Sequence, residues 1–338
     1  MHLEKRDVCK LVLGLILVCW TGSVSAQDNK NKLGFTGYIQ PVVSVARTKS
    51  IASVGDDNKR IESLDQKAKA ETTFVPMVMC NMAYTFADGA ARVWTGSSGD
   101  SMADSSSFLE LGASYTMADD TTLILAYTPP LIDNDVWKDP FLVGKNRTET
   151  NQSEQAFRLG VESVLGTPFS VSYSFAIQDV DNERAGHSLL GTSLSAGDLE
   201  ALKRSGNRHQ SNIRYNISLG GGVSLQPEIY YLRGDVDGAA NRFDGYGGEL
   251  ALTYATGKMV WMASMAMGKG EYDEVHPVFD KTREDSIYAF SLGMEYQAPF
   301  GWESLAVTLF SAYNRQNSNI NFYEESACVG GLGLTRSF

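Results

Sequence analysis

Hydrophobic and polar residues alternate along most of this chain from Leu33 onward, in segments of about 9 to 14 residues. The clearest segment covers 169–178, where large hydrophobic residues alternate with serine, alanine and glutamine. The same alternation recurs at 108–117, 208–219 and 286–297. Successive side chains of a β-strand point to opposite faces, so each segment has one apolar and one polar face. The pattern predicts an all-β chain.

The connections between these segments alternate in length. We expect fourteen strands, at 33–48, 71–87, 90–97, 106–117, 121–129, 154–165, 169–178, 207–219, 223–234, 243–255, 259–270, 285–297, 304–314 and 325–338. Every second connection is short, at 87–89, 118–120, 166–168, 220–222, 256–258 and 298–303, whereas 49–70, 130–153 and 179–206 are long and polar. Short turns on one side and long loops on the other are typical of membrane barrels. We therefore predict a transmembrane antiparallel up-and-down β-barrel of about 14 strands, with 12 or 16 as alternatives.

The last ten residues read VGGLGLTRSF, and Leu332 and Leu334 share a face with the terminal Phe338. This ending resembles the C-terminal signature of bacterial outer-membrane β-barrels. It departs from that signature at Arg336, where an apolar or aromatic residue is expected. The resemblance implies that the barrel assembly machinery recognises the chain through Phe338.

Residues 1–26 have the three parts of a secretory signal peptide: a basic start, an apolar run from Leu11 to Trp20, and small residues up to Ala26. We expect the mature chain to start at Gln27. Because no linker-like change of composition divides the remainder, we expect 27–338 to form a single barrel domain.

The chain has 29 basic and 40 acidic side chains, a net charge of −11. An acidic exported protein is a poor partner for nucleic acid, so we expect none. Cys80 and Cys328 follow the predicted signal and fall on the outer face, on strands that flank the first strand from opposite sides. Two strand spacings, roughly 9 to 10 Å, exceed the usual reach of a disulfide, so we do not expect a bridge.

Charged residues occupy the positions opposite the apolar ones, and these predict the lining of a lumen. The predicted pore-lining residues are Arg92, Glu110, Arg158, Glu162, Arg208, Arg214, Glu228, Glu249 and Glu295. Unpaired buried charges are unfavourable, so these side chains need water or close partners. The two interpretations are an aqueous pore with a transverse field and a plugged interior joined by salt bridges.

The connection from Pro129 to Glu154 carries Asp133, Asp135 and Asp139 among large hydrophobic residues. It resembles the third outer loop of general porins, which folds into the mouth and narrows it. These carboxylates then form a constriction loop that favours cations. The alternative is an ordinary solvated loop.

His209 and Ser211 lie in a short stretch that resembles the His-x-Ser-Asn motif of outer-membrane phospholipase A. Two positions apart on a strand, they share a face toward the lipid. The orienting asparagine of that family would fall on Val223, which leaves the pair without a third group. A phospholipase is therefore the less favoured alternative. His187 and His276 are too few and too dispersed for a metal site, so we expect neither metal nor cofactor.

As a whole, residues 27–338 resemble an uncharacterised proteobacterial family of porin-like outer-membrane proteins, a domain-of-unknown-function family. The resemblance implies location in the bacterial outer membrane and contact with its lipid and lipopolysaccharide. It assigns neither a substrate nor site residues. We predict a channel for passive diffusion of small hydrophilic solutes, weakly selective for cations, and homo-oligomers by analogy with porins. The alternative is a closed barrel with a structural or adhesive role.

Overall fold

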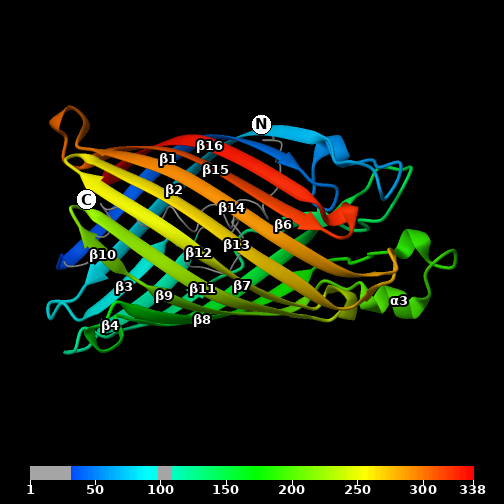
Figure 1. Cartoon of the computed structure of the whole chain (residues 1–338), viewed down its shortest axis with the longest axis horizontal. Helices are drawn as coiled ribbons and strands as arrows, with labels where there is room; N and C mark the ends of the chain where they lie inside the picture. Colours follow the sequence, from blue (N-terminus) through cyan, green and yellow to red (C-terminus); the bar gives the residue numbers. More distant parts are fainter. Residues whose placement is uncertain (1–31, 98–108) are drawn as a thin grey trace.

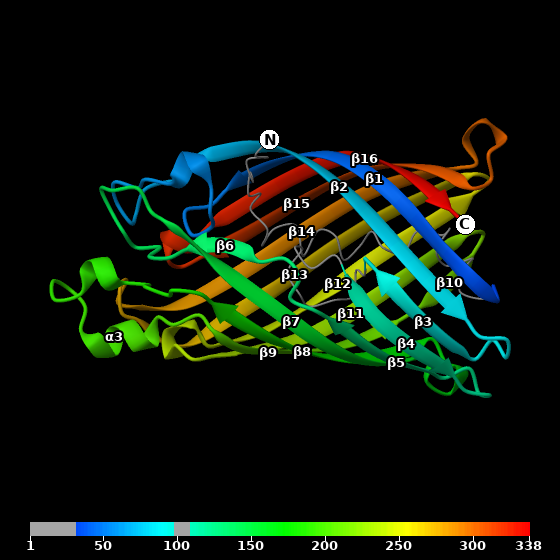
Figure 2. The same cartoon turned by 180° about the vertical axis from the view of Figure 1, so that it is seen from behind.

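A computed structural model describes residues 32–97 and 109–338 and shows one closed β-barrel of fourteen tilted antiparallel strands (Figures 1 and 2). The first strands are β1 (Gly34–Lys49), β2 (Ala70–Thr85), β3 (Ala91–Gly96), β4 (Glu110–Thr116), β5 (Thr122–Thr128), β7 (Glu149–Glu162) and β8 (Phe169–Val180). The barrel continues through β9 (Gly206–Tyr215) and β10 (Ile217–Gly220), then β11 (Val223–Val236), β12 (Phe243–Thr256), β13 (Met259–His276), β14 (Lys281–Gln297), β15 (Leu305–Ser318) and β16 (Glu325–Ser337). The fourteen-strand prediction is confirmed.

Two further features make the strand labels run to sixteen. Tyr215 ends β9 and Ile217 begins β10, and both segments pair with β11, so together they form one strand of the barrel. The short β6 (Asn134–Trp137) pairs only with β7 and belongs to the connection before it. The remaining elements are short: α3 (Ala196–Ala201), η1 (Asp56–Asn58), η2 (Val164–Gly166), η3 (His187–Leu189), η4 (Ala239–Asn241), η5 (Pro299–Gly301) and η6 (Asn321–Tyr323). No helix of the described residues is long and apolar enough to span a membrane.

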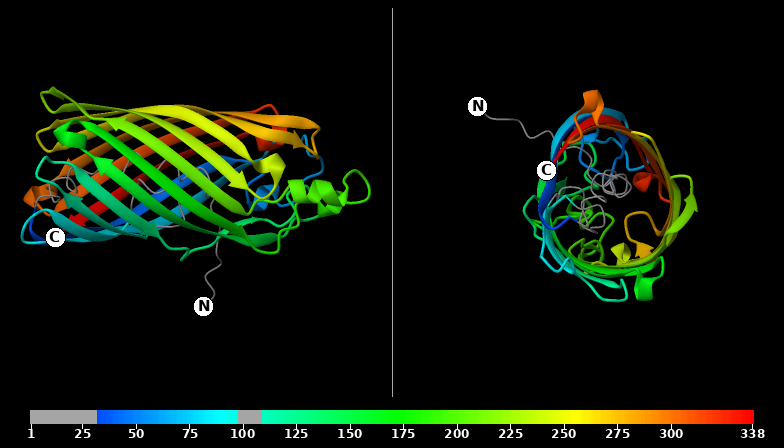
Figure 3. Two further views of the ribbon diagram at one scale, coloured as in Figure 1. Left: turned by 90° about the horizontal axis from the view of Figure 1, so that it is seen from below. Right: turned by 90° about the vertical axis from the view of Figure 1, so that its left-hand side faces the viewer.

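The two ends of the barrel differ as the connection lengths predict. Short turns lie at one end, which Figure 3 shows from the side and end-on, and the long connections with α3 lie at the other. Gly257, with φ +56, lies in the tight turn between β12 and β13. Gly222, in the turn between β10 and β11, also has a positive φ of +80. An added Cβ there would lie 2.1 Å from the carbonyl oxygen of Ala255. Both turns need glycine because this left-handed region strains other residues.

The barrel closes where β16 pairs with β1. The backbone amide of Gly37 donates to the carbonyl oxygen of Phe338 at 3.0 Å, and the amide of Phe338 donates back at 2.9 Å. An added Cβ at Gly37 would lie 2.8 Å from the Phe338 ring, so the ring packs directly against this glycine. The terminal phenylalanine therefore joins the last strand to the first through backbone hydrogen bonds and packing of its ring.

The outer face of the strands is apolar between two rings of tyrosines. Exposed tyrosines near the short turns are Tyr115, Tyr215, Tyr254 and Tyr296, and those nearer the long loops are Tyr231, Tyr246, Tyr288 and Tyr313. On β13 the outward residues change from Met265 and Met267 to Lys269 and Glu271. An apolar belt bordered by aromatic rings is the surface that a bilayer requires, and the charged residues mark its outer limit.

β13 and β14 extend well beyond the predicted 259–270 and 285–297. Strand pairing continues to His276 and Lys281 although the outward residues are now charged. The sequence prediction followed the apolar alternation, which ends at the membrane border, whereas backbone pairing continues into the aqueous region. Residues 1–26, the predicted signal peptide, and 106–108 of the predicted fourth strand lie outside the described residues.

Candidate functional site

An ion pair between Glu110 and Arg158 lies on the inner face of the barrel. Nη2 of Arg158 donates to Oε1 of Glu110 at 2.9 Å and to Oε2 at 3.2 Å, and both side chains are buried. The guanidinium reaches from β7 to β4 across β5, where the inward residue opposite Arg158 is Ala126. Nε1 of Trp94 on β3 donates to the same carboxylate at 3.0 Å. A small residue on the middle strand thus lets a charged pair lie along the wall.

A second pair repeats this arrangement one step around the barrel. Arg208 on β9 binds Glu154 on β7, and the residue between them on β8 is Ala176, which is fully buried. A third pair joins directly opposed residues of β9 and β11, with Nε of Arg214 donating to Glu228 at 2.6 Å. Each of these three arginines therefore has a carboxylate partner on the wall, as a buried guanidinium requires.

The other predicted pore-lining residues also point inward. Glu162 lies opposite Thr122, and Glu249 lies opposite Glu228. Glu295 is buried on β14 and accepts a hydrogen bond from Gln297 at 3.2 Å. Nη1 of Arg92 on β3 has no hydrogen-bond partner among the described residues. All nine residues thus share the inner face. The sequence prediction missed two further inner-face residues, Glu154 and Trp94. It placed Glu154 at the very start of a strand, and it assigned no role to Trp94.

Long side chains of the wall lie flat on glycines. A Cβ at Gly112 would lie 2.0 Å from the Trp94 ring, and one at Gly331 would lie 2.6 Å from the Phe310 ring. The rings therefore occupy the space that ordinary side chains would fill on the neighbouring strand. Glycine at these positions keeps bulky groups against the wall, away from the axis of the lumen.

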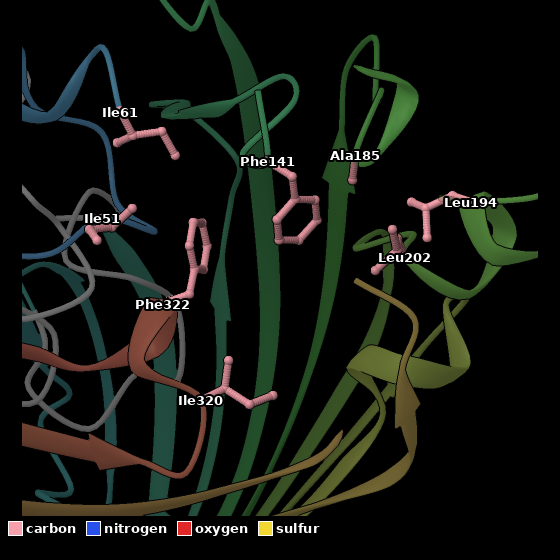
Figure 4. Close-up of a cluster of buried hydrophobic side chains, with 8 residues drawn as sticks. All are labelled: Ile51, Ile61, Phe141, Ala185, Leu194, Leu202, Ile320 and Phe322. Carbon is pink, nitrogen blue, oxygen red and sulfur yellow. The ribbon is translucent and has the colours of Figure 1, made fainter. Parts of the chain in front are cut away.

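The long connections pack together at the outer mouth, in what we call the loop core (Figure 4). Its buried residues are Ile51, Ile61, Phe141, Ala185, Leu194, Leu202, Ile320 and Phe322. They come from the connections β1–β2, β5–β7, β8–β9 and β15–β16, and Val278 and Phe279 of β13–β14 pack against them. In a barrel of fourteen strands, β8 and β9 lie opposite β1, so these contacts cross the mouth.

Arg147 holds the connections of the loop core together. Its side chain is fully buried, and Nη1 donates to the carbonyl oxygens of Ile51 at 2.8 Å and Pro140 at 3.0 Å. Nη2 donates to the carbonyl of Asn58, and the guanidinium lies 4.3 Å from the Trp137 ring centroid. Burial lowers the pKa of Arg147 to about 10. One cation thereby satisfies carbonyl groups of two loops.

His276 is a second buried polar group among the long connections, which together with the loop core we call the cap. Its Nδ1 accepts a hydrogen bond from the amide of Val278 at 3.3 Å, so Nε2 carries the proton that faces the Tyr323 hydroxyl at 2.8 Å. The ring packs on Phe141 and Phe279. Burial, with a smaller contribution from Arg283, lowers the pKa of His276 to about 3. The cap therefore holds this histidine neutral.

Of the three predicted constriction-loop carboxylates, Asp139 is engaged in loop structure. It accepts hydrogen bonds from the backbone amides of Phe141 and Gly186 at 3.1 Å and of Ser188 at 2.8 Å. It therefore joins the β5–β7 and β8–β9 connections. Asp133 is exposed and Asp135 is half-buried. A constriction role for these carboxylates stays a prediction.

His209 and Ser211 face outward on β9, as expected. Nδ1 of His209 is hydrogen-bonded to the hydroxyl of Tyr173 at 2.7 Å, and Ser211 lies opposite Tyr173 and Tyr231 in the strand register. Nδ1 of His209 is therefore bonded to a tyrosine and not to Ser211. Between these two described residues the structure forms no serine–histidine hydrogen bond.

Cys80 and Cys328 are both free and exposed on the outer face. They lie opposite Ile39 and Arg47 of β1, eight positions apart and hence roughly 26 Å along the strand. Within 32–97 and 109–338, no three His, Cys, Asp or Glu side chains gather in a group that could hold a metal ion.

A closed barrel with an apolar belt, tyrosine rings, short turns at one end and charged pairs inside defines a class. The protein is a transmembrane β-barrel of the bacterial outer-membrane type. Residues 34–335 match the family described as protein of unknown function (DUF2860), and the chain belongs to that family.

Several solved outer-membrane proteins are similar to this structure at low sequence identity. A monoaromatic hydrocarbon channel, CymD, is 10% identical over 100% of this chain and 99% of its own, with a TM-score of 0.49. The outer membrane channel DcaP of Acinetobacter baumannii is 8% identical over 90% and 98%, with a TM-score of 0.44. The outer membrane protein OmpT of Vibrio cholerae is 12% identical over 90% and 97%, also at 0.44. No curated protein matches the sequence.

Proposed function

We propose that the protein is a passive channel through which small water-soluble solutes diffuse across the outer membrane, with a weak preference for cations. The observation that carries this proposal is that long inner side chains lie along the barrel wall. Arg158 and Arg208 cross a neighbouring strand over alanines, and Trp94 lies flat on Gly112. Charged groups held along the wall support a water-filled lumen, because a barrel of this width is not readily filled by its own side chains.

The preference for cations rests on the balance of the inner face. Three arginines are paired with Glu110, Glu154 and Glu228. Among the inner-face residues named above, four arginines stand beside six glutamates: Glu110, Glu154, Glu162, Glu228, Glu249 and Glu295. The excess of carboxylates lowers the potential of the lumen and raises the local concentration of cations. Asp133 and Asp135 add negative charge near the outer mouth.

The loop core makes this a gated channel rather than a permanently open one. Loops from opposite sides of the barrel share one hydrophobic core, so solute entry from the long-loop side requires part of it to separate. Separation exposes the apolar side chains and the carbonyl groups held by Arg147. The closed arrangement is therefore the stable one, and opening is brief.

The outer rim offers contacts for lipopolysaccharide, which we propose as a lipid partner. Arg47, Lys49 and Arg315 are exposed on the outward face near the long loops, and Lys49 and Arg315 both lie opposite Ser326. Guanidinium and ammonium groups at this height meet the phosphates of the outer leaflet. Assembly into homo-oligomers and recognition of Phe338 by the barrel assembly machinery complete the proposal.

Liposome swelling tests the channel. Vesicles containing the purified full-length protein are diluted into isotonic arabinose, sucrose or stachyose. A water-filled lumen lets the smallest sugar enter fastest, and Arg147→Ala, which loosens the loop core, speeds entry of all three. A folded protein whose vesicles swell no faster than empty ones, with or without Arg147→Ala, contradicts the proposal and favours the closed, structural barrel.

A further inference from the structure

We propose that one part of the lumen wall is a binding site for neutral, hydroxyl-rich solutes, the class that small carbohydrates represent. This inference deepens the proposed function and rests on it, because the site lies inside the channel. It arises from two features that occur side by side on the inner face. One is a tyrosine ring that lies on glycines, and the other is a row of hydrogen-bonded amide and charged groups next to that ring.

Tyr230 on β11 forms the aromatic part of the site. Its chain neighbours Ile229 and Tyr231 are exposed on the outer face, so Tyr230 points into the lumen. Gly247 of β12 lies opposite Tyr230, and Gly268 of β13 lies opposite Gly247. An added Cβ at either glycine would lie 2.4 Å from the Tyr230 hydroxyl. The ring therefore crosses β12 and rests on the backbone of two glycines.

The other side of this ring is accessible from the lumen. Tyr230 is only half-buried although glycines lie beneath its ring, and the exposed part faces the lumen because the residue points inward. Tyr38, the inward tyrosine of β1, is buried by comparison. The negatively polarised face of an aromatic ring attracts the C–H groups on the flat side of a sugar ring. Tyr230 thus provides a platform on which such a ring can stack.

A row of four polar side chains, which we call the polar track (Gln210, Asn212, Arg214 and Glu228), runs beside this platform on β9 and β11. Nε2 of Gln210 donates to Oδ1 of Asn212 at 2.9 Å, and Nδ2 of Asn212 donates to Oε1 of Glu228 at 2.5 Å. Nε of Arg214 donates to Oε2 of the same glutamate at 2.6 Å. All four residues are half-buried, so the track is both fixed in place and accessible to solutes.

The platform and the polar track are close enough for one sugar ring to contact both. Asn212 lies opposite Tyr230 in the strand register, which places the two Cβ atoms roughly 5 Å apart. Glu228 lies two positions from Tyr230 on the same face of β11, roughly 7 Å away. A six-membered sugar ring with its hydroxyl groups covers a span of this size.

The hydrogen bonds of the polar track favour a neutral solute. They use one N–H of each amide group and one acceptor position on each oxygen of Glu228, whereas an amide has two N–H donors and a carboxylate about four acceptor positions. A sugar hydroxyl both donates and accepts, so it can bind there without breaking these bonds. An anion must instead compete with Glu228 for Arg214, and a cation must compete with Arg214 for Glu228.

Block of the potassium current by glucose tests this site, with the refolded protein in planar bilayers and the sugar added to both sides. We expect the current to fall to a plateau as the glucose concentration rises, which defines a half-block concentration. Triethylene glycol dimethyl ether is similar in size to glucose and has no hydroxyl group. It should lower the current in proportion to its concentration, without a plateau.

Tyr230→Ala should raise the half-block concentration for glucose about tenfold, the effect of one lost aromatic contact. Tyr230→Phe keeps the ring and should change it about twofold at most. Asn212→Leu keeps the side-chain size without the amide and should raise it about threefold. Tyr231→Ala is the matched control, because it removes the adjacent ring from the outer face, and it should change nothing. If Tyr230→Ala does not fold, Gly268→Ala should also weaken the block, since its Cβ displaces the end of the ring.

A current that falls without a plateau in both glucose and the ether overturns the proposal while the channel function stands. A saturable block that is equal in the wild type, Tyr230→Ala and Asn212→Leu overturns the location of the site. Tighter block by gluconate or by protonated glucosamine than by glucose overturns the assigned neutral class. A lack of any current contradicts the channel function itself and the site with it.

Discussion

Arg158 and Glu110 meet 2.9 Å apart on the inner face of the barrel although a complete strand separates them. Ala126, the residue between them, is small enough for the guanidinium to pass over it. The same relationship joins Arg208 and Glu154 across Ala176. Alanines on the middle strands therefore decide where charged side chains lie in the lumen.

Arg158→Ala should raise selectivity for cations and lower stability. The change leaves the buried carboxylate of Glu110 without its guanidinium, which costs about 3 kcal/mol of unfolding free energy. The uncompensated charge should increase the cation-to-anion permeability ratio about twofold. Reversal potentials under a potassium chloride gradient measure the ratio, and denaturant unfolding measures the stability.

Glu110→Gln combined with Arg158→Ala is the control for that prediction. Removing both charges should return the selectivity close to wild type and recover part of the stability. Equal selectivity of the single variant, the double variant and the wild type would remove this pair from the lining of the pore.

Arg147→Ala should destabilise the loop core without disrupting the barrel. The variant removes the guanidinium that binds carbonyl groups of Ile51 and Pro140, and unsatisfied buried carbonyls cost about 1–3 kcal/mol each. We expect longer openings in single-channel records and faster protease cleavage within 50–69. Arg60→Ala, which removes only an exposed pair with Glu62, should change neither. Loop cleavage that is equal in both variants would contradict the role of Arg147.

Acidification on the long-loop side should open the cap through His276. Its pKa is about 3 in the closed cap and 6.5 when exposed, so the open state binds the extra proton between these values. The stabilisation of the closed state is thus complete above pH 6.5 and is lost as the pH falls through that window. One proton changes the opening equilibrium at most tenfold per pH unit, or about 30-fold from pH 7.5 to pH 5.

His276→Gln isolates this effect. Glu325 lies in the same cap, and burial raises its pKa, so protonation of Glu325 favours the closed state as the pH falls. The variant retains Glu325 and loses the histidine. Its open probability should stay constant or fall on acidification, measured in the same bilayer at both pH values. An unchanged acid-induced opening would assign the titration to another group.

Phe338→Ala should reduce the amount of barrel inserted in the outer membrane. The ring packs on Gly37, and its loss exposes that contact where β16 pairs with β1. We expect an accumulation of unfolded chains, scored by heat-modifiable migration on gels. Phe300→Ala is the control, since Phe300 is 94% exposed in a short turn and should assemble normally. Equal assembly of the two variants would contradict the role of the terminal ring.

The strands and their facing could be predicted because the bilayer imposes an apolar set on one face of every strand. The loop core could not. Ile51 and Ile61 are single large hydrophobic residues in a polar connection, and Phe141 begins a short apolar stretch at 141–143. No periodicity relates loops that meet only in space. Isolated large hydrophobic residues in long loops were the available signal.

The site was predicted in part for a related reason. Charged inward residues stand out against serine and glycine, so Arg158 and Glu110 were identified, but their pairing depends on Ala126 of another strand. The inward apolar residues of β1 were not identified because this strand has apolar residues on both faces, with Val42 inward and Val43 outward. Alternation gives no contrast there.

Single-channel conductance in a planar bilayer, with the reversal potential recorded under a potassium chloride gradient, tests the central claim most directly. The purified, refolded protein should give stable open steps interrupted by closures, with a reversal potential shifted toward that of potassium. A correctly folded barrel that never conducts, even when Arg147→Ala loosens the loop core or when the long-loop side is acidified, would contradict the channel function.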